Sequence, residues 1–143
     1  MTVVKTKKIH PRAKPPQDMT EGAACSDLYC CEPVLVKNGE LTRARTGLVM
    51  EIPKGHCVEI LPRSSMALHG IIIPNSPGVI DSDYRGEVIV LLFGLFVKNF
   101  EIFDTGSRIA QARLVKSEQA KYEVADEVSQ TQRGSGGFGS TGK

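Results

Sequence analysis

The stretch "IIIPNSPGVIDSDYRGEVIVLLFGLFV", residues 71–97, decides the expected fold class. Its aliphatic and β-branched runs at 71–73 and 87–92 lie on either side of a segment rich in Asn, Ser, Pro, Gly and Asp. β-Branched residues favour strands, and the residue types between the two runs favour turns. The stretch therefore predicts a large β-hairpin with a polar tip.

Neighbouring stretches predict further short strands. Residues 48–52 and 57–61 are separated by Pro-Lys-Gly, which predicts a tight hairpin. Residues 100–103 and 109–115 add two strands on either side of an Asp-Thr-Gly turn. Short strands at close spacing, with almost no helical periodicity, predict an all-β fold, namely a jelly-roll-like antiparallel sandwich or barrel with one short helix.

The one expected helix is "SSMALHG", residues 64–70. Ser64 or Ser65 can cap its first turn, and Gly70 can end it. Because Arg63 precedes the helix, a cation, two hydroxyls and unpaired backbone N–H groups meet at one point, which favours a bound phosphate. The alternative is that Ser64 only caps the helix and Arg63 forms a surface ion pair.

Length and composition limit the possible organisation. The 143 residues suffice for one domain, and we expect a single β domain over residues 1–128 that begins with an extended lead-in over 1–22. A net charge of +2, the absence of Trp and the lack of a long apolar run predict no nucleic-acid partner and no membrane segment. The start lacks the apolar core of a secretory signal and the four cysteines fit no disulfide framework, which predicts a cytoplasmic protein with reduced thiols.

The chain ends with "RGSGGFGSTGK", residues 133–143, in which five glycines surround Phe138. Glycine-rich backbone forms neither a helix nor a strand alone, so residues 129–143 are expected to form a flexible arm. The amides and hydroxyls of the arm can surround a phosphate, although it lacks the strand and helix of a P-loop.

Two further stretches carry polar groups that could do chemistry. Asp81 and Asp83 flank Ser82 in the polar hairpin tip, where one carboxylate could activate water as a general base. The alternative is an Asp-rich turn without a catalytic role. Gln111 lies among apolar residues and needs hydrogen-bond partners if it is buried; otherwise it belongs to an edge strand.

Five stretches, in order along the chain, resemble the five motifs of the trimeric dUTPases, the deoxyuridine triphosphate nucleotidohydrolases. They are "EGAACSDLYC" (21–30), "LPRSSMALHG" (61–70), "NSPGVIDSDYRGEV" (75–88), "TGSRIAQARLV" (105–115) and "RGSGGFGSTG" (133–142). The resemblance implies a jelly-roll-like subunit, a homotrimer with shared active sites, and Mg²⁺-dependent hydrolysis of dUTP to dUMP and pyrophosphate. Such an enzyme limits uracil in DNA and supplies dUMP for thymidylate synthesis, in the cytoplasm or, in a eukaryote or its virus, in the nucleus.

The resemblance also implies roles for single residues. Asp81 matches the aspartate that orients water for attack on the α-phosphorus, and Gln111 the glutamine that helps to fix that water. Tyr84 matches the tyrosine that packs under the deoxyribose and excludes a 2′-hydroxyl, and Asp27 an acidic residue that contacts Mg²⁺ through water. The other expected substrate-binding residues are Arg63, Ser64 and Ser65 for phosphates, Asn75, Gly78, Val79 and Ile80 for uracil, and Arg133, Phe138, Gly139, Ser140 and Thr141 on the arm.

Two motifs depart from the family pattern. Cys25-Ser26 stands where the family usually has Gly-Tyr, and Ser107 stands where it has Asp. The missing carboxylate at 107 is expected to alter stability or rate and to remove a partner of Arg63 or Arg108. Two alternatives stay open: dCTP deaminase, which is similar in fold but needs a glutamate near the base, and a catalytically idle trimer that senses the nucleotide.

Overall fold

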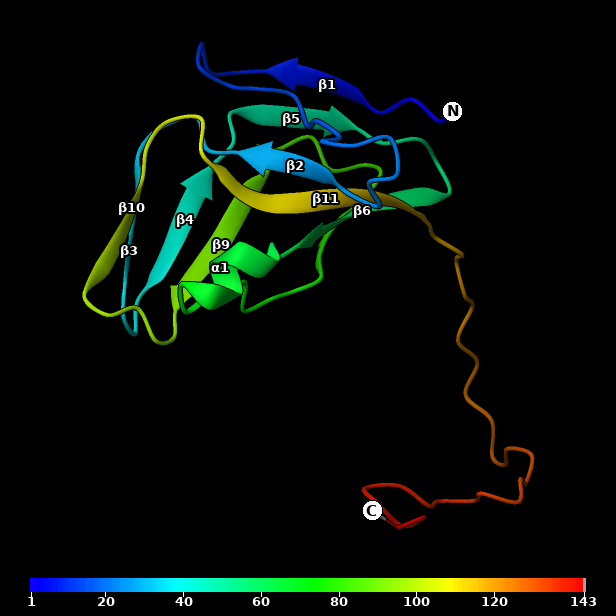
Figure 1. The fold of residues 1–143 in the computed structure, drawn as a ribbon. Coiled ribbons are helices and arrows are strands. Elements are labelled where there is room, and N and C mark those ends of the chain that lie inside the picture. The colour runs from blue at the N-terminus through cyan, green and yellow to red at the C-terminus, as the bar shows by residue number, and fades with distance from the viewer. Residues whose placement is uncertain (143) are drawn as a thin grey trace.

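The computed structural model describes residues 1–142 as short strands, one short helix and a long C-terminal segment (Figure 1). The strands are β1 (Lys5–Lys8), β2 (Ser26–Tyr29), β3 (Val34–Lys37), β4 (Leu41–Arg45), β5 (Leu48–Glu51), β6 (His56–Leu61), β7 (Ile71–Ile72), β8 (Gly78–Ile80), β9 (Ile89–Gly94), β10 (Phe100–Phe103) and β11 (Arg108–Lys116). The helix is α1 (Ser64–Leu68). It is too short to cross a membrane, and the described chain contains no longer helix that could.

The strands form four antiparallel sheets. The largest has the order β2-β11-β6-β8, and a second has the order β4-β9-β7. Two strand pairs, β1-β5 and β10-β3, lie at the top and the left of the fold in Figure 1. This is the all-β antiparallel architecture that the sequence predicts.

Strand β9 shows how the alternation of side chains builds the core. Val90 and Leu92 are buried on one face of the strand, whereas Ile89, Leu91 and Phe93 are only half-buried on the other. Successive side chains of a strand point to opposite faces, so one face of β9 packs in the core and the other remains accessible. Each aliphatic side chain that is fully buried stabilises the folded state by roughly 1.5–3 kcal/mol.

Of the two predicted hairpins, one is confirmed and one is wrong. β7 pairs with β9, as the stretch 71–97 predicts, and the intervening β8 pairs with β6. β5 and β6 form no hairpin, because β5 pairs with β1 while β6 already has β11 and β8 on its two edges. The turn before β6 therefore carries the chain from one sheet to another.

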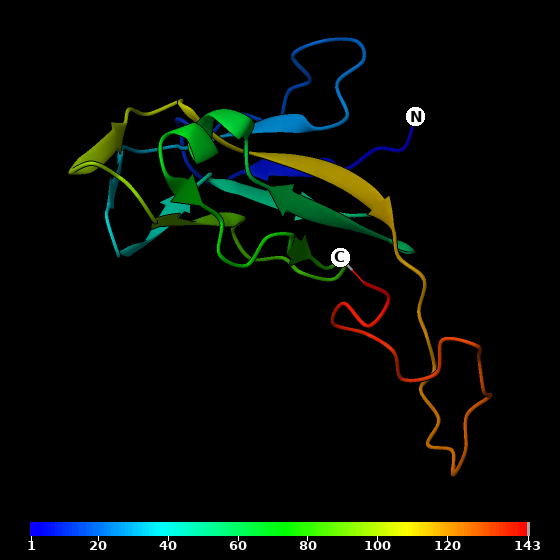
Figure 2. The same ribbon diagram turned by 60° about the horizontal axis from the view of Figure 1, so that its bottom comes forward.

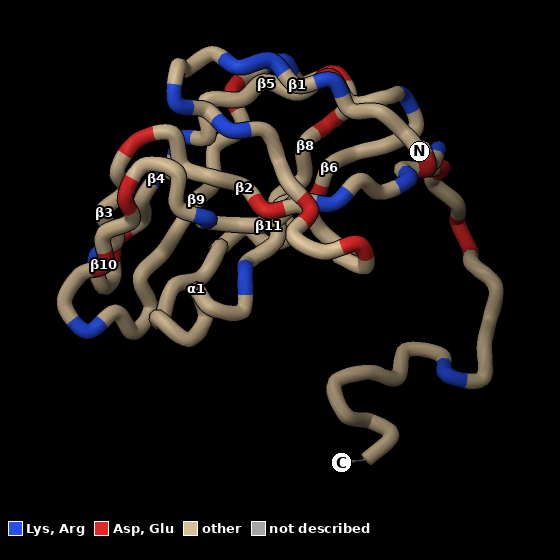
Figure 3. The backbone as a smooth tube through the Cα atoms, turned by 45° about the horizontal axis from the view of Figure 1, so that its top comes forward, with Lys and Arg blue, Asp and Glu red and all other residues tan. Residues whose placement is uncertain are grey.

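The expected lead-in contains a strand that the sequence analysis missed. β1 consists of Lys5, Thr6, Lys7 and Lys8, and it pairs with β5 (Figure 3). Lysines are common on edge strands because their charge discourages pairing with other molecules. The lysines also remove the apolar alternation by which a strand is recognised in sequence.

The helix begins at Ser64, but neither serine caps it. The N-cap residue is Arg63, with extended backbone angles (φ −87°, ψ 146°) and no side-chain capping bond. The predicted serine cap is therefore wrong: the chain enters helical geometry at Ser64, so both serines lie within the first turn. Gly70, with φ of +73°, ends the turn as predicted, and a Cβ there would collide with the backbone of Phe96.

The chain leaves the body after β11. Residues 117–142 contain no strand or helix and extend away from the sheets, as Figures 1 and 2 show from two directions. The predicted division into a β domain ending at 128 and an arm from 129 stays a prediction, and residue 143 of that arm lies outside the described residues.

Candidate active site

One carboxylate and two arginines form the first part of the site, the arginine cluster of Asp27, Arg63 and Arg108. Arg63 Nε donates to Asp27 Oδ1 at 3.0 Å, and Arg108 Nη1 donates to Asp27 Oδ2 at 3.2 Å. Arg63 Nη1 also donates to Ser65 Oγ at 3.2 Å and to the Arg108 carbonyl at 3.3 Å. Ser65 is half-buried, while Ser64 is exposed beside the cluster. The predicted phosphate motif is thus brought together with Asp27.

Three elements place the arginine cluster. Asp27 lies on β2, Arg108 begins β11, and Arg63 follows the end of β6. Because β11 runs between β2 and β6, the three side chains meet at one end of the central sheet strands. Two positive charges and one negative charge leave the cluster with a net charge of +1, which favours an anionic ligand.

Gln111 lies on β11 next to this cluster. Its Cα partners are Asp27 on β2 and Leu61 on β6, so it belongs to a strand paired on both sides, and the edge-strand alternative is wrong. Gln111 Nε2 donates to the Pro62 carbonyl at 2.9 Å. This bond uses one of the two amide N–H donors and fixes the side chain, which leaves the other N–H and the amide oxygen available.

The second part of the site is a pocket of about 250 Å³, called the hairpin pocket here. It is lined by residues of the β7–β9 hairpin and of the neighbouring β4, namely Arg43, Asn75, Val79, Ile80, Asp81, Tyr84, Glu87, Ile89 and Leu91. Five of these residues were predicted as site residues from the sequence. Gly78 does not line the pocket but approaches Asn75 so closely that a Cβ would lie 3.2 Å from Asn75 Nδ2.

The loop at the edge of the hairpin pocket is bonded to itself. Tyr84 N donates to the Asp81 carbonyl at 3.2 Å, and Tyr84 Oη donates to the Glu87 carbonyl at 3.1 Å. Gly86 lies against the Tyr84 ring, and a Cβ at that position would collide with the ring. These contacts fix the ring of Tyr84 over the turn. Gly86 was not predicted as a site residue from the sequence, because the closeness of its backbone to the Tyr84 ring is visible only in the folded turn.

Asp81 and Asp83 differ in what they border. Both line a second pocket of about 790 Å³ with Lys54, His56 and Cys57. Asp81 alone also lines the hairpin pocket. Of the two carboxylates that the sequence offered, Asp81 is therefore the one that faces the residues expected to contact the nucleoside.

The arm lies apart from both parts of the site. Phe138 is fully exposed and has a positive φ of 52°, and Arg133 Nε donates to the carbonyl of Gly136 at 2.8 Å. The hydrogen bonds found for residues 133–142 join them only to the same segment or to Thr131. The predicted arm residues are thus not brought to the rest of the site within one chain.

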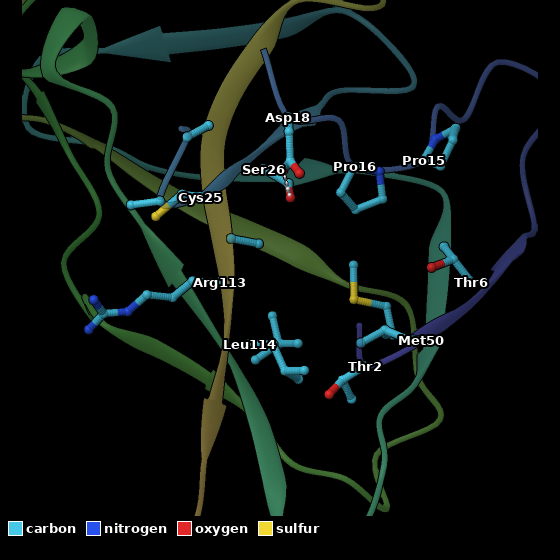
Figure 4. Close-up of a pocket in the computed structure, with 15 residues that line it drawn as sticks. Thr2, Thr6, Pro15, Pro16, Asp18, Cys25, Ser26, Met50, Arg113 and Leu114 are labelled. Atoms are coloured by element: carbon cyan, nitrogen blue, oxygen red, sulfur yellow. Dashed lines mark hydrogen bonds between the residues drawn. The ribbon is translucent and has the colours of Figure 1, made fainter. Parts of the chain in front are cut away.

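A third pocket, of about 560 Å³, is shown in Figure 4. It lies between the N-terminal segment and β11, and none of its lining residues was predicted as a site residue. Ser26 faces it and bonds to Asp18, whereas Asp27, the next residue, faces the arginine cluster. Strand alternation thus separates this pocket from the candidate site.

The cysteines carry no reactive signature. All four are free, and Cys30 and Cys31 are buried. Burial raises the pKa of both thiols, and Cys30 Sγ donates to the Asp104 carbonyl at 3.2 Å. A raised pKa keeps a thiol protonated and unreactive, in agreement with the prediction of ordinary reduced thiols.

Asp27 is the only predicted metal-contacting residue, and its surroundings can be tested against Mg²⁺. Residues 1–142 contain no group of three or more His, Cys, Asp or Glu side chains that could surround a metal ion. Each oxygen of Asp27 accepts one arginine N–H, and a carboxylate can accept about four hydrogen bonds. The remaining lone pairs fit contact with metal-bound water rather than direct binding of a metal.

Paired arginines with unused N–H donors, a polar pocket of nucleoside size and a glycine-rich arm define a protein that handles a small anionic ligand on an all-β scaffold. The dUTPase profile matches residues 12–142. The deoxyuridine 5′-triphosphate nucleotidohydrolase of Nautilia profundicola is 48% identical over 141 residues, which cover 98% of this chain and 99% of that protein. Its counterpart in Helicobacter pylori strain J99 is 40% identical, with 97% and 96% covered.

The chain belongs to the dUTPase family. Solved structures agree on the fold: a Staphylococcus bacteriophage 80alpha dUTPase mutant with dUpNHpp has a TM-score of 0.90 over the whole of both chains at 21% identity. A dUTPase from phage phi11 of S. aureus, described with a structural Mg(II) ion, has a TM-score of 0.82 at 15% identity and covers 90% of this chain and 100% of that one. The predicted family, the dUTP diphosphatase class and the jelly-roll-like fold are confirmed.

Proposed function

We propose that this protein hydrolyses dUTP to dUMP and pyrophosphate in a homotrimer whose active sites are shared between subunits. The observation that supports shared active sites is that the expected residues fall into three separate groups: the arginine cluster, the hairpin pocket and the arm. Each group suits one part of the substrate, but the hairpin pocket has no lining residue in common with the arginine cluster. A site made from several copies of the chain would unite them.

Asp81 is the general base of the proposed reaction. Its carboxylate takes a proton from water, whose oxygen attacks the α-phosphorus while the bond from that phosphorus to the bridging oxygen breaks. Pyrophosphate leaves with the bonding electron pair, and dUMP remains. Gln111, held by the bond from one of its amide N–H groups to the Pro62 carbonyl, accepts a hydrogen bond from the water through its amide oxygen.

The arginine cluster binds the phosphates. Arg63 Nη2, Arg108 Nε and Arg108 Nη2 make no hydrogen bond to the described part of the chain, so they can donate to phosphate oxygens. Ser64 and Ser65 supply hydroxyl donors beside them. Asp27 would contact Mg²⁺ through water, and the ion, bound chiefly by the triphosphate, would supply positive charge that offsets the charge of the phosphates.

The hairpin pocket selects the nucleoside. Asn75 and the backbone from Gly78 to Ile80 would bind the edge of uracil and leave no space for a thymine methyl. Tyr84, fixed by Gly86 and the Glu87 carbonyl, would lie under the deoxyribose and exclude a 2′-hydroxyl. An aromatic ring held in this way rejects an extra hydroxyl by steric contact.

A half-buried apolar face supports assembly. Leu41 of β4 and Ile89, Leu91 and Phe93 of β9 lie on the accessible side of the β4–β9 ladder, with Arg43 among them. Such a patch on a small protein marks an interface. In the proposed trimer the arm reaches a neighbouring site, where Phe138 stacks on uracil and Arg133, Gly139, Ser140 and Thr141 bind the γ-phosphate.

The test is pyrophosphate release by the purified protein with Mg²⁺, comparing dUTP with dTTP, dCTP and UTP. Selective turnover of dUTP supports the proposal and a role in limiting uracil in DNA and supplying dUMP for thymidylate synthesis. Tight binding of dUTP without turnover would instead identify an idle nucleotide sensor. Release of ammonia from dCTP would identify a deaminase.

A further inference from the structure

We propose that Asp27 is a positioning residue that fixes Arg63 and Arg108 in the arrangement that receives the triphosphate. This inference rests on the proposed function, since it concerns how that site binds its substrate. In this role Asp27 acts through protein contacts only, and these contacts exist before any nucleotide or metal binds.

The carboxylate of Asp27 is itself held rigidly. Its backbone forms two hydrogen bonds with Gln17, at 2.8 and 3.3 Å, and its strand pairs with β11 on the other side. The residue is only 7% exposed. Each carboxylate oxygen accepts from a different arginine, so one fixed group sets the separation of two guanidinium groups.

The two arginines depend on Asp27 to different degrees. Arg63 keeps other partners, because its Nη1 also donates to Ser65 and to the Arg108 carbonyl. The Arg108 side chain is 42% exposed, and its one hydrogen bond within residues 1–142 goes to Asp27. Without Asp27, Arg108 would be free to move and the two like charges would repel each other.

Asp27 is the only carboxylate that pairs with the two arginines among residues 1–142, because Ser107 supplies none. Ser107 contributes backbone bonds to Cys30 and Asp104, while its hydroxyl makes no hydrogen bond in the described chain. No second carboxylate forms an ion pair with Arg63 or Arg108 among residues 1–142. Ser107 thus supplies no partner for either arginine, and both share Asp27 instead; the expected effect on stability or rate stays a prediction.

The kinetic test uses Asp27→Asn. Its side chain keeps the shape but not the charge, so we expect kcat to fall about 10²-fold, the effect of misplacing bound groups by about 1 Å. KM should stay within about threefold, because the extra positive charge offsets the lost geometry. Glu59→Gln is the matched control: it breaks the 2.9 Å ion pair with Arg113 on β6 and β11, away from the cluster, and should leave both constants unchanged.

Two variants keep the result interpretable. Asp27→Glu tests whether a carboxylate alone suffices and should restore kcat only in part, because its longer side chain shifts both arginines. Ser107→Asp, combined with Asp27→Asn, should restore kcat at least about tenfold by supplying a new partner for the arginines. Failure of that rescue would overturn the inference that a carboxylate beside Arg63 and Arg108 is what positions them.

A readout without nucleotide or metal separates positioning from turnover. In NMR spectra of the free protein, the Arg63 Hε–Nε signal should be protected from exchange and should lose that protection in Asp27→Asn. The Arg113 signal, which depends on Glu59, should be unaffected. This readout does not require that the protein hydrolyse dUTP, so its failure and that of the proposed function are distinguishable.

A role of Asp27 through Mg²⁺ alone predicts a different pattern. Raising Mg²⁺ would then restore kcat in Asp27→Asn, and the Arg63 signal would stay protected. Positioning predicts a lower plateau of kcat that persists at saturating Mg²⁺. Full recovery at high Mg²⁺, or wild-type kcat in Asp27→Asn, would overturn the proposal.

Discussion

The arginine cluster and the arm represent opposite ways of preparing a binding group. In the cluster, Asp27 is buried, its backbone is paired, and it bonds Arg63 and Arg108 at 3.0 and 3.2 Å. On the arm, Phe138 is fully exposed, and among the described residues the Arg133 side chain bonds only to the carbonyl of Gly136 in its own segment. One region is shaped before a ligand arrives, and the other is not.

This difference assigns the two regions different energetic roles. Fixing one residue of flexible chain costs roughly 1–2 kcal/mol, so ordering a glycine-rich arm consumes part of the binding energy of the ligand. In a preformed cluster the cost of ordering the chain is already met when the protein folds, so it does not reduce the binding energy of the ligand. The proposed enzyme would thus bind phosphate on a rigid surface and use the arm to exclude water once the substrate is present.

The largest loss of activity is expected from a substitution in the preformed β-sheet part of the protein. Asp81→Asn should lower kcat about 10³-fold by removing the general base, with little change in the affinity for a non-hydrolysable dUTP analogue. Asp83→Asn is the matched control, because Asp83 borders only the larger of the two pockets that Asp81 lines. Steady-state kinetics and calorimetry measure both quantities. Equal losses in the two variants would remove Asp81 from the base role.

The second-largest loss of activity is expected from truncation of the arm. Removing residues 133–143 should lower kcat/KM about 10²-fold, since stacking and phosphate contacts are lost and water enters the site. The melting temperature should not change, because the described residues of this segment bond only to one another and to Thr131. Full activity of the truncated protein would contradict the closing role of the arm.

A smaller effect is expected where the body selects the sugar. Tyr84→Ala should reduce the preference for dUTP over UTP about tenfold, because the ring that occupies the space of a 2′-hydroxyl is gone. Competition between the two nucleotides measures this ratio. Discrimination that survives the substitution would show that another group excludes ribose.

The smallest effect concerns an ion pair far from both regions. Lys5 donates to Glu51 at 2.9 Å across β1 and β5, and this bond lowers the pKa of the Glu51 carboxyl. A lowered pKa stabilises the fold above the pKa of the unfolded chain, and that stabilisation is lost as pH falls through the lower, folded pKa. Glu51→Gln should therefore slightly lower the melting temperature at pH 7, and calorimetric scans should show this difference shrink as pH falls through the folded pKa.

The sequence predicted the elements of the fold better than their pairing. The hairpin of β7 and β9 was readable because its partners are joined by one polar loop. The pairing of β5 with β1 was not, because it depends on which strand edges remain free in the assembled fold. β1 itself was missed because its lysines hide the alternation of a strand.

The candidate site shows the same limit. Motif order pointed to Asp81, Tyr84 and the phosphate-binding residues, and the structure places the first two on one pocket. That Asp27 bonds both Arg63 and Arg108 could not be read from the sequence, because the three residues lie on separate strands or loops that meet only through β11. Which side chains meet in this way depends on the register in which the strands pair, and that register is not visible in the sequence.

The most direct test of a shared active site is complementation between two inactive chains. Asp81→Asn protein, with an intact arm, is mixed with protein truncated after Gln132, which has an intact Asp81, under conditions that allow subunits to exchange. If Asp81 and the arm come from different subunits, about a quarter of the sites in randomly mixed trimers contain both, so dUTP hydrolysis should rise to about that fraction of wild type. Activity no higher than the sum of the two separate proteins would show that each chain builds its site alone.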